Sequence, residues 1–380
     1  MTNLSDQRPL RILHCHSTFA AGGKELRSVA LMNAFGADAE HTVVSAEPEA
    51  MAARAHIAPG IKVRFPADFP SLTGKPTPGR LVTLADAMKP YDLVCTYNWG
   101  AMDAAMAHGV FAPSLRLPPL IHHEDGFNED EAVRLKPMRN WYRRAALRHA
   151  HSLVVPSRLL EDIALKVWEQ PRPKVVRIAN GIDTAAFAAA PDPAGLRVIK
   201  RPGERWVGTL AGLRAVKQLP LLVEAMQALD EDWHLVIAGE GPEREAIRAR
   251  AAALELSHRV HLAGAIARPQ QIIGLFDIFA LSSRSEQFPL SVVEAMAAGL
   301  PVAAPDVGDI RAMLAEENRP YVAVPDDAAA LGQMLADLAA DDALRTAIGA
   351  ANQARARAEY GADQMVERYR ALYWGAAGRS

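Results

Sequence analysis

Short runs rich in apolar and β-branched residues alternate with longer amphipathic stretches along almost the whole chain. Six such runs lie in the first half, at residues 11–16, 42–46, 93–97, 119–123, 153–157 and 175–180. Helical periodicity lies between them, for example from Lys24 to Phe35 and from Leu159 to Glu169. This alternation predicts βαβ units and a parallel sheet. The runs show little alternation of apolar and polar residues, which is typical of strands that helices cover on both faces.

The alternation is interrupted at residues 185–205, where three prolines and several small residues leave no strong period, and we expect a linker there. Six further runs follow, at residues 205–210, 233–239, 260–264, 277–282, 301–306 and 321–325. From Asp326 to Tyr373 the pattern is helical and rich in alanine. We therefore predict an α/β protein of two doubly wound, Rossmann-like domains that meet near residue 190.

The length of the chain also favours two domains. It has 380 residues, whereas a single hydrophobic core rarely grows beyond about 250–300 residues. Ligands of doubly wound domains bind beyond the carboxyl ends of the parallel strands. Two such domains that face each other across a cleft would therefore place the binding site in that cleft.

Composition and charge exclude several classes of function. A formal net charge of −2 provides no electrostatic footprint for nucleic acid. Cys15 and Cys95 lie in apolar stretches, which is typical of buried thiols in a reduced cytosolic protein. The first ten residues are polar, unlike a signal peptide, and no run approaches the roughly 18 apolar residues of a membrane span. We expect a cytoplasmic protein that can still touch a membrane surface.

Residues 282–308 carry the sharpest chemical pattern. A predicted strand ends, Glu286 follows on a loop, and Pro289 opens a helix that contains Glu294. The free amides of such a first turn, together with the positive end of the helix dipole, suit a phosphate. The residues that we expect around this phosphate are Phe288, Pro289, Leu290 and Ser291. Glu286 can then bind sugar hydroxyls and Glu294 ribose hydroxyls; the alternative is a capped surface helix with one solvated glutamate.

Glu286 and Glu294 belong to the segment EQFPLSVVEAMAAGLPV, which resembles the E-x7-E signature of retaining glycosyltransferases of family 4. Other segments resemble blocks of that family in the same order along the chain. They are AGGKE (21–25), VVPS (154–157), VVRIANGIDTAAF (175–187), VGTLAGLRAVKQLPLLVEA (207–225), LVIAGEGPERE (235–245) and VHLAG (260–264). The resemblance implies the GT-B fold and transfer of a sugar from a nucleoside-diphosphate sugar with retention of anomeric configuration.

Several residues outside the E-x7-E segment are candidates for binding the donor. Gly22 and Gly23 follow the first strand and open a helix, so their amides can approach a sugar or phosphate closely. The resemblance assigns Lys217 to the departing diphosphate, and Arg214 can add a fork of donors. The family usually has arginine directly after the strand's glycine, where this chain has Thr209, so we move the arginine role to Arg214. A solvated loop is the alternative for Arg214 and Lys217.

Gly239 is a further donor-side candidate, because it follows a strand and precedes a helix. The segment Gly239-Glu240-Gly241-Pro242 lacks the third glycine of a dinucleotide fingerprint, since that position is Arg244. We therefore interpret it as a loop that lines the donor site. It does not indicate a dinucleotide cofactor.

A pair of histidines ends the predicted strand at residues 119–123. The resemblance implies an active-site histidine at this strand end; His122 fits that position best and His123 is the alternative. Glu124 and Asp125 follow, and we place them with His123 on the acceptor side. A histidine at a strand end is more often structural. No third ligand has metal-site spacing, so we expect no metal and no cofactor besides the sugar nucleotide.

Residues 134–150 hold six lysines and arginines interleaved with Trp141, Tyr142 and Leu147. Such a helix can lie on an anionic membrane surface, although a basic run is usually a solvated face. Membrane contact would matter because a lipid-linked acceptor would be presented there.

These observations define the function and the domains that we expect. Residues 1–188 would bind the acceptor, residues 189–360 the UDP- or GDP-sugar, and residues 361–380 would form a helix that returns to the first domain. The chain would be a hexosyltransferase in polysaccharide, glycolipid or cell-envelope glycan synthesis. A glycosidase, a GT-B nucleotide-sugar epimerase and a non-catalytic sugar-nucleotide-binding subunit are the alternatives, and acceptor-dependent release of nucleoside diphosphate separates them from a transferase.

Overall fold

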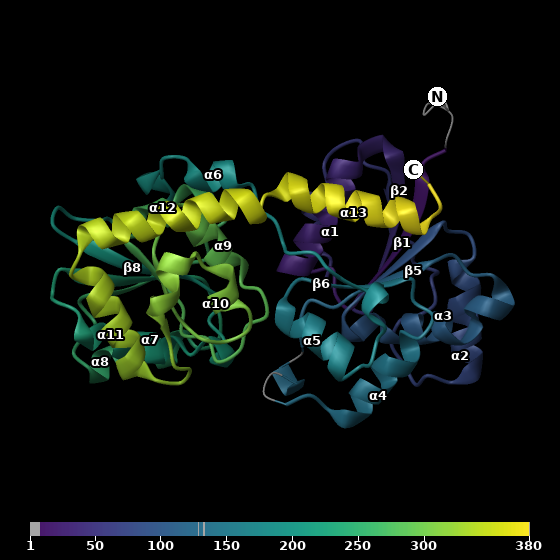
Figure 1. The fold of residues 1–380 in the computed structure, drawn as a ribbon, viewed down its shortest axis with the longest axis horizontal. Helices are drawn as coiled ribbons and strands as arrows, with labels where there is room; N and C mark the ends of the chain where they lie inside the picture. Colours follow the sequence, from purple (N-terminus) through teal and green to yellow (C-terminus); the bar gives the residue numbers. More distant parts are fainter. Residues whose placement is uncertain (1–7, 128, 132–133, 380) are drawn as a thin grey trace. The chain divides into compact units, whose positions relative to one another are not determined.

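The computed structural model describes residues 8–127, 129–131 and 134–379. The chain divides into two compact units, unit 1 with residues 1–179 and 365–380, and unit 2 with residues 180–364. Each unit has its own sheet with helices packed against it (Figure 1). The division falls after residues 179 and 364, whereas the boundaries expected from the sequence lie after residues 188 and 360.

The described part of unit 1 contains a parallel sheet of seven strands in the order β3-β2-β1-β4-β5-β6-β7. The strands are β1 Leu10–His16, β2 Ala39–Ser45, β3 Val63–Arg64, β4 Leu93–Tyr97, β5 Leu120–His123, β6 Ser152–Val155 and β7 Val175–Arg177. All six runs expected in this half form strands, which confirms the predicted parallel sheet. The additional edge strand β3 has only two residues, too few to produce a pattern in the sequence.

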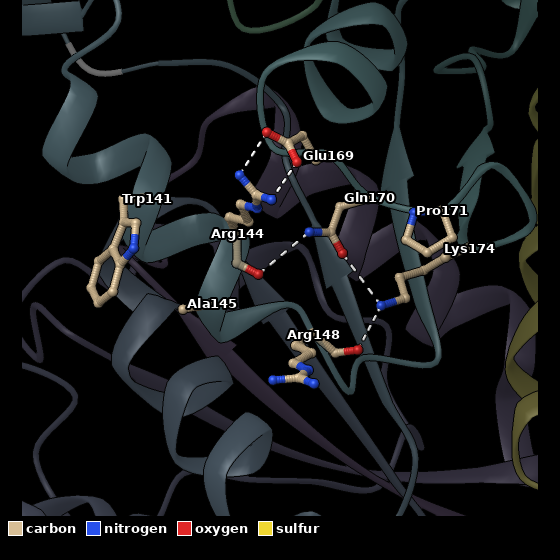
Figure 2. A pocket seen from close by; sticks show the side chains of 8 residues that line it. All are labelled: Trp141, Arg144, Ala145, Arg148, Glu169, Gln170, Pro171 and Lys174. Carbon is tan, nitrogen blue, oxygen red and sulfur yellow. Dashed lines mark hydrogen bonds and ion pairs between the residues drawn. The ribbon is translucent and has the colours of Figure 1, made fainter.

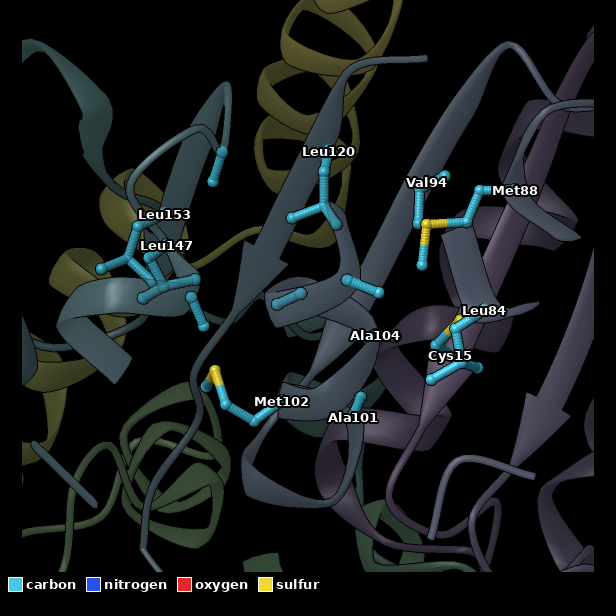
Figure 3. Packing of buried hydrophobic residues seen from close by; sticks show 14 of the residues in the cluster. Cys15, Leu84, Met88, Val94, Ala101, Met102, Ala104, Leu120, Leu147 and Leu153 are labelled. Carbon is cyan, nitrogen blue, oxygen red and sulfur yellow. The ribbon is translucent and has the colours of Figure 1, made fainter. Parts of the chain in front are cut away.

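Helices cover both faces of this sheet. They are α1 Gly23–Phe35, α2 Pro78–Met88, α3 Met102–Leu115, α4 Pro137–Ala146, α5 Arg158–Lys166 and α13 Ala362–Ala376. Side chains of α2, α3 and α5 pack with Leu13, Val94 and Leu120 in one apolar core, part of which Figure 3 shows. Because side chains alternate along a strand, the neighbouring residues Ile12, Cys95 and Ile121 face the other core.

The C-terminal helix α13 belongs to this second core. Its residues Met365, Tyr369 and Tyr373 are buried and pack with apolar residues of β1, β4 and β5. The three residues recur at intervals of four, so they lie on one face of the helix. This packing confirms the predicted return of the last helix to the first domain.

In its described residues unit 2 has a parallel sheet of six strands in the order β10-β9-β8-β11-β12-β13. The strands are β8 Arg205–Leu210, β9 Trp233–Ala238, β10 Val260–Gly264, β11 Ile278–Ala280, β12 Val302–Pro305 and β13 Val322–Ala323. The helices are α6 Thr184–Ala188, α7 Leu219–Ala225, α8 Arg244–Ala253, α9 Leu290–Ala297, α10 Ile310–Met313, α11 Ala328–Ala339 and α12 Asp342–Glu359. The six predicted runs of the second half all form strands.

The expected linker at residues 185–205 is wrong for its first half. Asp183 caps helix α6 by accepting a hydrogen bond from the Ala186 amide at 3.0 Å, and Phe187 is buried. Leu196 is buried as well, and the Asp192 amide donates to the Gln271 carbonyl at 2.7 Å. Small residues and prolines hid these elements, because one capped turn and two apolar side chains are enough to attach the segment to unit 2.

Candidate active site

Lys217 and Glu286, 69 positions apart in the sequence, meet beyond the carboxyl ends of β8 and β11. Lys217 Nζ donates to Glu286 Oε1 at 2.5 Å. The two side chains are only 17% and 11% exposed, so the pair is weakly screened by solvent. The sequence predicted both residues for the same site, and the structure brings them together. Their roles toward a substrate stay predictions.

The first turn of α9 lies directly after this pair. Pro289 is the residue before the helix, and among the described residues no side chain caps the amides that follow it. Phe288 is buried and packs edge-on against Tyr360 with ring centroids 5.6 Å apart. Leu290 and Ser291 begin the helix. An uncapped first turn can accept an anion, and phosphate binding by these residues stays a prediction.

Glu294 lies in the second turn of α9. Burial raises the pKa of its carboxyl group from 4.5 to about 7. Neither a hydrogen bond nor an ion pair joins this carboxyl to another side chain in the described parts of the chain. A half-buried carboxyl group without a side-chain partner can accept hydrogen bonds from a ligand's hydroxyls.

The remaining donor-side candidates lie on two loops of unit 2. Gly239 has φ +155°, and a Cβ there would lie 1.8 Å from the Ala211 carbonyl oxygen. Arg214 is exposed on the neighbouring loop. Thr209, the departure from the family pattern, is fully buried, and its hydroxyl has no hydrogen-bond partner within the described residues. The buried, uncharged Thr209 therefore cannot take the role of the family's arginine, and Arg214 stays the candidate for binding the diphosphate.

His122 and His123 face opposite sides of the unit 1 sheet. His122 is fully buried; its Nδ1 lies 2.8 Å from Thr96 Oγ1 and its Nε2 lies 3.7 Å from Glu124 Oε2. Within the described residues His122 Nε2 has no hydrogen-bond partner. A contact between this atom and a sugar requires the buried ring to become accessible, and this role stays a prediction.

His123 instead packs in the core with α13. Tyr97 stacks on its ring with centroids 4.5 Å apart, and its Nε2 is hydrogen bonded to the Tyr373 hydroxyl at 2.8 Å. Burial holds the pKa of His123 well below its ordinary range. This geometry gives His123 a packing role in unit 1, and the expected acceptor-side role has no structural support.

The two acidic residues after β5 are both in ion pairs. Glu124 is fully buried and lies 3.4 Å from Arg143 Nε. Asp125 pairs with Arg27 through both of its oxygens, with Arg27 Nη2 2.8 Å from Oδ2. Asp125 is 13% exposed, so it is the more accessible of the two predicted acceptor-side carboxylates.

The glycine loop at the start of α1 has a carboxylate of its own chain beside it. Gly22 precedes α1 and Gly23 begins it. A Cβ on Gly22 would lie 2.8 Å from Glu25 Oε2. Glu25 is buried, accepts from Thr18 Oγ1 at 2.7 Å and pairs with Lys24. A donor phosphate at Gly22 and Gly23 would have to share this helix end with Glu25, and donor binding here stays a prediction.

The basic stretch at residues 134–150 is largely neutralised within unit 1. Arg143 is fully buried and donates to Glu131 at 3.2 and 3.0 Å. Lys136 and Arg139 pair with Asp130. The stretch is therefore only in part a solvated basic face, because acidic residues near it in the chain pair with these three cations.

Beside α4 lies a groove of about 440 Å³. Figure 2 shows its lining residues, which are Trp141, Arg144, Ala145, Arg148, Glu169, Gln170, Pro171 and Lys174. Lys174 Nζ donates to the Leu147 and Arg148 carbonyls at 2.9 and 2.8 Å, so its charge stabilises the end of α4. Trp141 is 63% exposed and Met138 is 76% exposed. Across the described ranges, no helix has both the length and the apolar character needed to span a bilayer.

The described residues also contain no group of three or more histidine, cysteine, aspartate or glutamate side chains arranged to hold a metal ion. This observation does not test whether the reaction needs a metal, so catalysis without a metal stays a prediction from the sequence.

Two family models match consecutive parts of the chain. The model described as Glycosyltransferase Family 4 matches residues 21–186, and the model described as Glycosyl transferases group 1 matches residues 197–355. The chain belongs to glycosyltransferase family 4. The two matches together span both units, so membership of family 4 rests on the whole architecture and not on the E-x7-E motif alone.

Curated relatives in this family share part of their length with the chain. The chain is 29% identical over 209 residues to the lipopolysaccharide core biosynthesis mannosyltransferase LpsB of Rhizobium meliloti, covering 52% of this chain and 59% of that protein. It is 29% identical over 195 residues to a GDP-mannose-dependent alpha-mannosyltransferase of Mycolicibacterium smegmatis, covering 50% and 49%. The chain therefore spans about half the length of the curated relatives that it matches.

Solved structures confirm the GT-B fold. Anabaena HepE in complex with UDP superposes with a TM-score of 0.79 at 19% identity, over 96% of this chain and 99% of that one. Sucrose-phosphate synthase from Thermosynechococcus elongatus superposes with a TM-score of 0.76, also at 19% identity, over 96% and 98% of the two chains. Identities this low establish the fold of this family 4 protein and nothing about its substrates.

Sequence reasoning missed the two serines after β11. Ser283 Oγ donates to Glu286 Oε1 at 2.7 Å, and Ser282 Oγ donates to the Lys217 carbonyl at 2.8 Å. Both serines are buried. Polar residues that directly follow a buried strand at its carboxyl end were the available signal.

Proposed function

We propose that this protein is a retaining glycosyltransferase that moves a sugar from a UDP- or GDP-sugar to an acceptor hydroxyl. The product would be a polysaccharide, a glycolipid or a cell-envelope glycan. The observation that carries the proposal is the Lys217–Glu286 contact of 2.5 Å immediately before the uncapped first turn of α9. It joins a cation for phosphate, a carboxylate for sugar hydroxyls and a helix N-terminus for anions.

The proposed reaction requires stabilisation of a departing diphosphate and of positive charge on the sugar. Lys217, Arg214 and the α9 amides would hold the diphosphate in a site prepared before the reaction begins. Glu286 would orient the sugar and offer negative charge beside it. Glu294 would accept hydrogen bonds from the ribose hydroxyls, which is favourable because its carboxyl lacks a side-chain partner among the described residues.

We place acceptor recognition on unit 1. Asp125 is the accessible carboxylate after β5 and can accept a hydrogen bond from an acceptor hydroxyl. His122 would offer its Nε2, which has no hydrogen-bond partner among the described residues, to the transferred sugar once the buried ring becomes accessible. Glu124 would act through its contacts with His122 and Arg143.

The relatives and neighbours support the choice of donor class. One curated relative is a GDP-mannose-dependent mannosyltransferase, and solved neighbours include HepE with UDP and with UDP-glucose. Lipopolysaccharide core biosynthesis is the process of two relatives, which supports an acceptor in a cell-envelope glycan.

The decisive test is acceptor-dependent release of nucleoside diphosphate. A thermal-shift screen with UDP-, GDP-, ADP- and TDP-sugars selects the donor, and release is then measured with and without pooled glycan acceptors. A transferase releases nucleoside diphosphate faster when acceptor is present. An epimerase converts the donor without acceptor, and a binding subunit shows a thermal shift without product.

A second part of the proposal concerns membrane contact through residues 134–150. The exposed side chains of Met138 and Trp141 lie on one helix with Arg148 shortly after it, an arrangement that suits the interface of an acidic bilayer. Cosedimentation with vesicles of one-quarter phosphatidylglycerol, compared between the native chain and Trp141→Ala, tests it. Binding that Trp141→Ala weakens is the expected result, and equal binding by both proteins contradicts membrane contact at this helix.

A further inference from the structure

The two residues proposed for the reaction, Lys217 and Glu286, are held by a clamp of two consecutive serines. Ser282 and Ser283 follow β11 after one residue, Leu281, and are 3% and 1% exposed. Ser282 Oγ donates to the Lys217 carbonyl at 2.8 Å, and Ser283 Oγ donates to Glu286 Oε1 at 2.7 Å. The hydroxyls therefore face different residues of the same pair.

The two oxygens of the Glu286 carboxylate have different hydrogen-bond partners. Oε1 accepts from both Lys217 Nζ and Ser283 Oγ, at 2.5 and 2.7 Å. In the part of the chain that the structure describes, no side chain donates to Oε2. Two donors on one oxygen fix the plane of the carboxylate, since each prefers a lone-pair direction of that oxygen. Oε2 is then presented to a ligand in a defined direction.

The backbone around the clamp is fixed as well. The Arg284 amide donates to the Val216 carbonyl at 2.9 Å, so the loop after β11 is tied to the turn that ends at Lys217. Gly308 lies against the other side of the loop, where a Cβ would be 2.3 Å from the Glu286 carbonyl oxygen. The Asp309 amide donates to the Gln287 carbonyl at 3.2 Å. Glu286 thus has little freedom except at its side-chain torsions, which Ser283 restricts.

We propose that Ser283 is a positioning residue for recognition of the sugar, whereas Ser282 is a positioning residue for recognition of the diphosphate. Ser283 acts only through the Glu286 carboxylate, and Ser282 acts through the backbone that carries Lys217. This inference rests on the proposed function, in which Glu286 binds the sugar and Lys217 the diphosphate.

The proposal predicts two different binding signatures. Ser283→Ala weakens binding of the intact sugar nucleotide about tenfold, the value of one hydrogen bond to a charged group, and leaves the affinity for free UDP or GDP unchanged. Ser282→Ala weakens binding of the sugar nucleotide and of the free nucleoside diphosphate by the same factor. A merely structural role for Ser283 lowers the melting temperature without changing the ratio of the two affinities. A merely structural role for Ser282 lowers the melting temperature without changing either affinity.

The experiment is calorimetric titration of the full chain with the selected sugar nucleotide and with its free nucleoside diphosphate. Ser114→Ala, which removes an exposed helix hydroxyl bonded to the Phe111 carbonyl, is the matched control. Ser283→Cys keeps the size of serine with a weak donor, so it tests the same contact if Ser283→Ala does not fold. The double variant with Glu286→Ala supplies the coupling, because Glu286→Ala removes the oxygen that accepts from Ser283 and should cancel the effect of Ser283→Ala.

The outcomes are distinguishable from failure of the proposed function. Native protein that binds no nucleotide overturns both. Native protein that binds the sugar nucleotide, with an unchanged affinity ratio in Ser283→Ala and Ser283→Cys, overturns the clamp alone. An additive effect of Ser283→Ala and Glu286→Ala also overturns it, because a residue that acts through the Glu286 side chain cannot add to the loss of that side chain.

Discussion

Glu294 offers the sharpest physical test in unit 2, because its carboxyl group is half-buried without a side-chain partner among the described residues. Burial raises its pKa from 4.5 to about 7. A carboxyl whose pKa is higher in the folded than in the unfolded protein stabilises the fold below the unfolded pKa, and this stability is lost as pH rises through the folded pKa. Glu294→Gln removes the titration and keeps the size of the side chain.

The expected gain in stability follows from these two pKa values. Each unit of pKa corresponds to about 1.4 kcal/mol. The raised pKa of Glu294 therefore lowers the unfolding free energy of the native protein by about 1.4 kcal/mol at pH 5.5 and by about 3.4 kcal/mol at pH 8.5. Contact of the Glu294 side chain with solvent reduces both of these free energies. Relative to the native protein, Glu294→Gln should therefore gain about 2 kcal/mol of unfolding free energy between pH 5.5 and pH 8.5.

Urea unfolding followed by tryptophan fluorescence at the two pH values measures this difference. Glu286→Gln is the comparison variant, because it removes a carboxylate that is paired with Lys217 and should destabilise the protein. A Glu294→Gln variant whose relative stability is the same at pH 5.5 and pH 8.5 would refute the reasoning. The variant should also bind nucleotide more weakly, if Glu294 accepts hydrogen bonds from ribose.

Three further predictions use matched pairs of variants. Tyr373→Phe should lose about 1 kcal/mol with its hydrogen bond to His123, whereas Tyr369→Phe should be neutral, since within the described residues the buried Tyr369 hydroxyl has no partner; chemical denaturation compares them. Arg143→Met should cost about 3–5 kcal/mol by leaving the buried Glu124 without its arginine and Glu131 with Arg139 alone. Arg144→Met, in an exposed pair with Glu169, should cost less than about 0.5 kcal/mol; similar melting temperatures for both variants would contradict this. Gly239→Ala should have a much lower melting temperature than Gly79→Ala. The methyl group added at residue 239 would meet the Ala211 carbonyl oxygen, whereas the methyl group added at residue 79 would meet no atom within 4 Å.

The fold could be predicted because its signal is repeated. Apolar runs such as residues 93–97 and 233–239 recur with helical stretches between them, so each strand supports the assignment of the next. Isolated features had no such support. The two-residue strand β3 and the capped turn of α6 depend on a few contacts with distant residues, and local patterns do not report those contacts.

The candidate site could be predicted in part for a similar reason. Lys217 and Glu286 both follow strands, and the carboxyl ends of parallel strands meet at one edge of a sheet, so their contact follows from topology. His122 and His123 could not be separated from the sequence, because neighbouring residues of a strand face opposite cores and the sequence does not say which face the site uses. The partners of Arg143 were equally hidden, since a basic helix looks solvated until the fold places Glu131 and Glu124 beside it.

A nucleotide-sugar site centred on Lys217 is the core of the proposed function, and calorimetric titration with UDP and GDP tests this site most directly. The native chain should bind one of the two nucleotides, and Lys217→Met should weaken that binding at least about tenfold, the value of one charge-assisted contact to phosphate. Lys166→Met, which removes a lysine that is 72% exposed, should bind like the native chain. Equal affinity of Lys217→Met and the native chain, or binding of neither nucleotide by the folded native chain, would contradict the account.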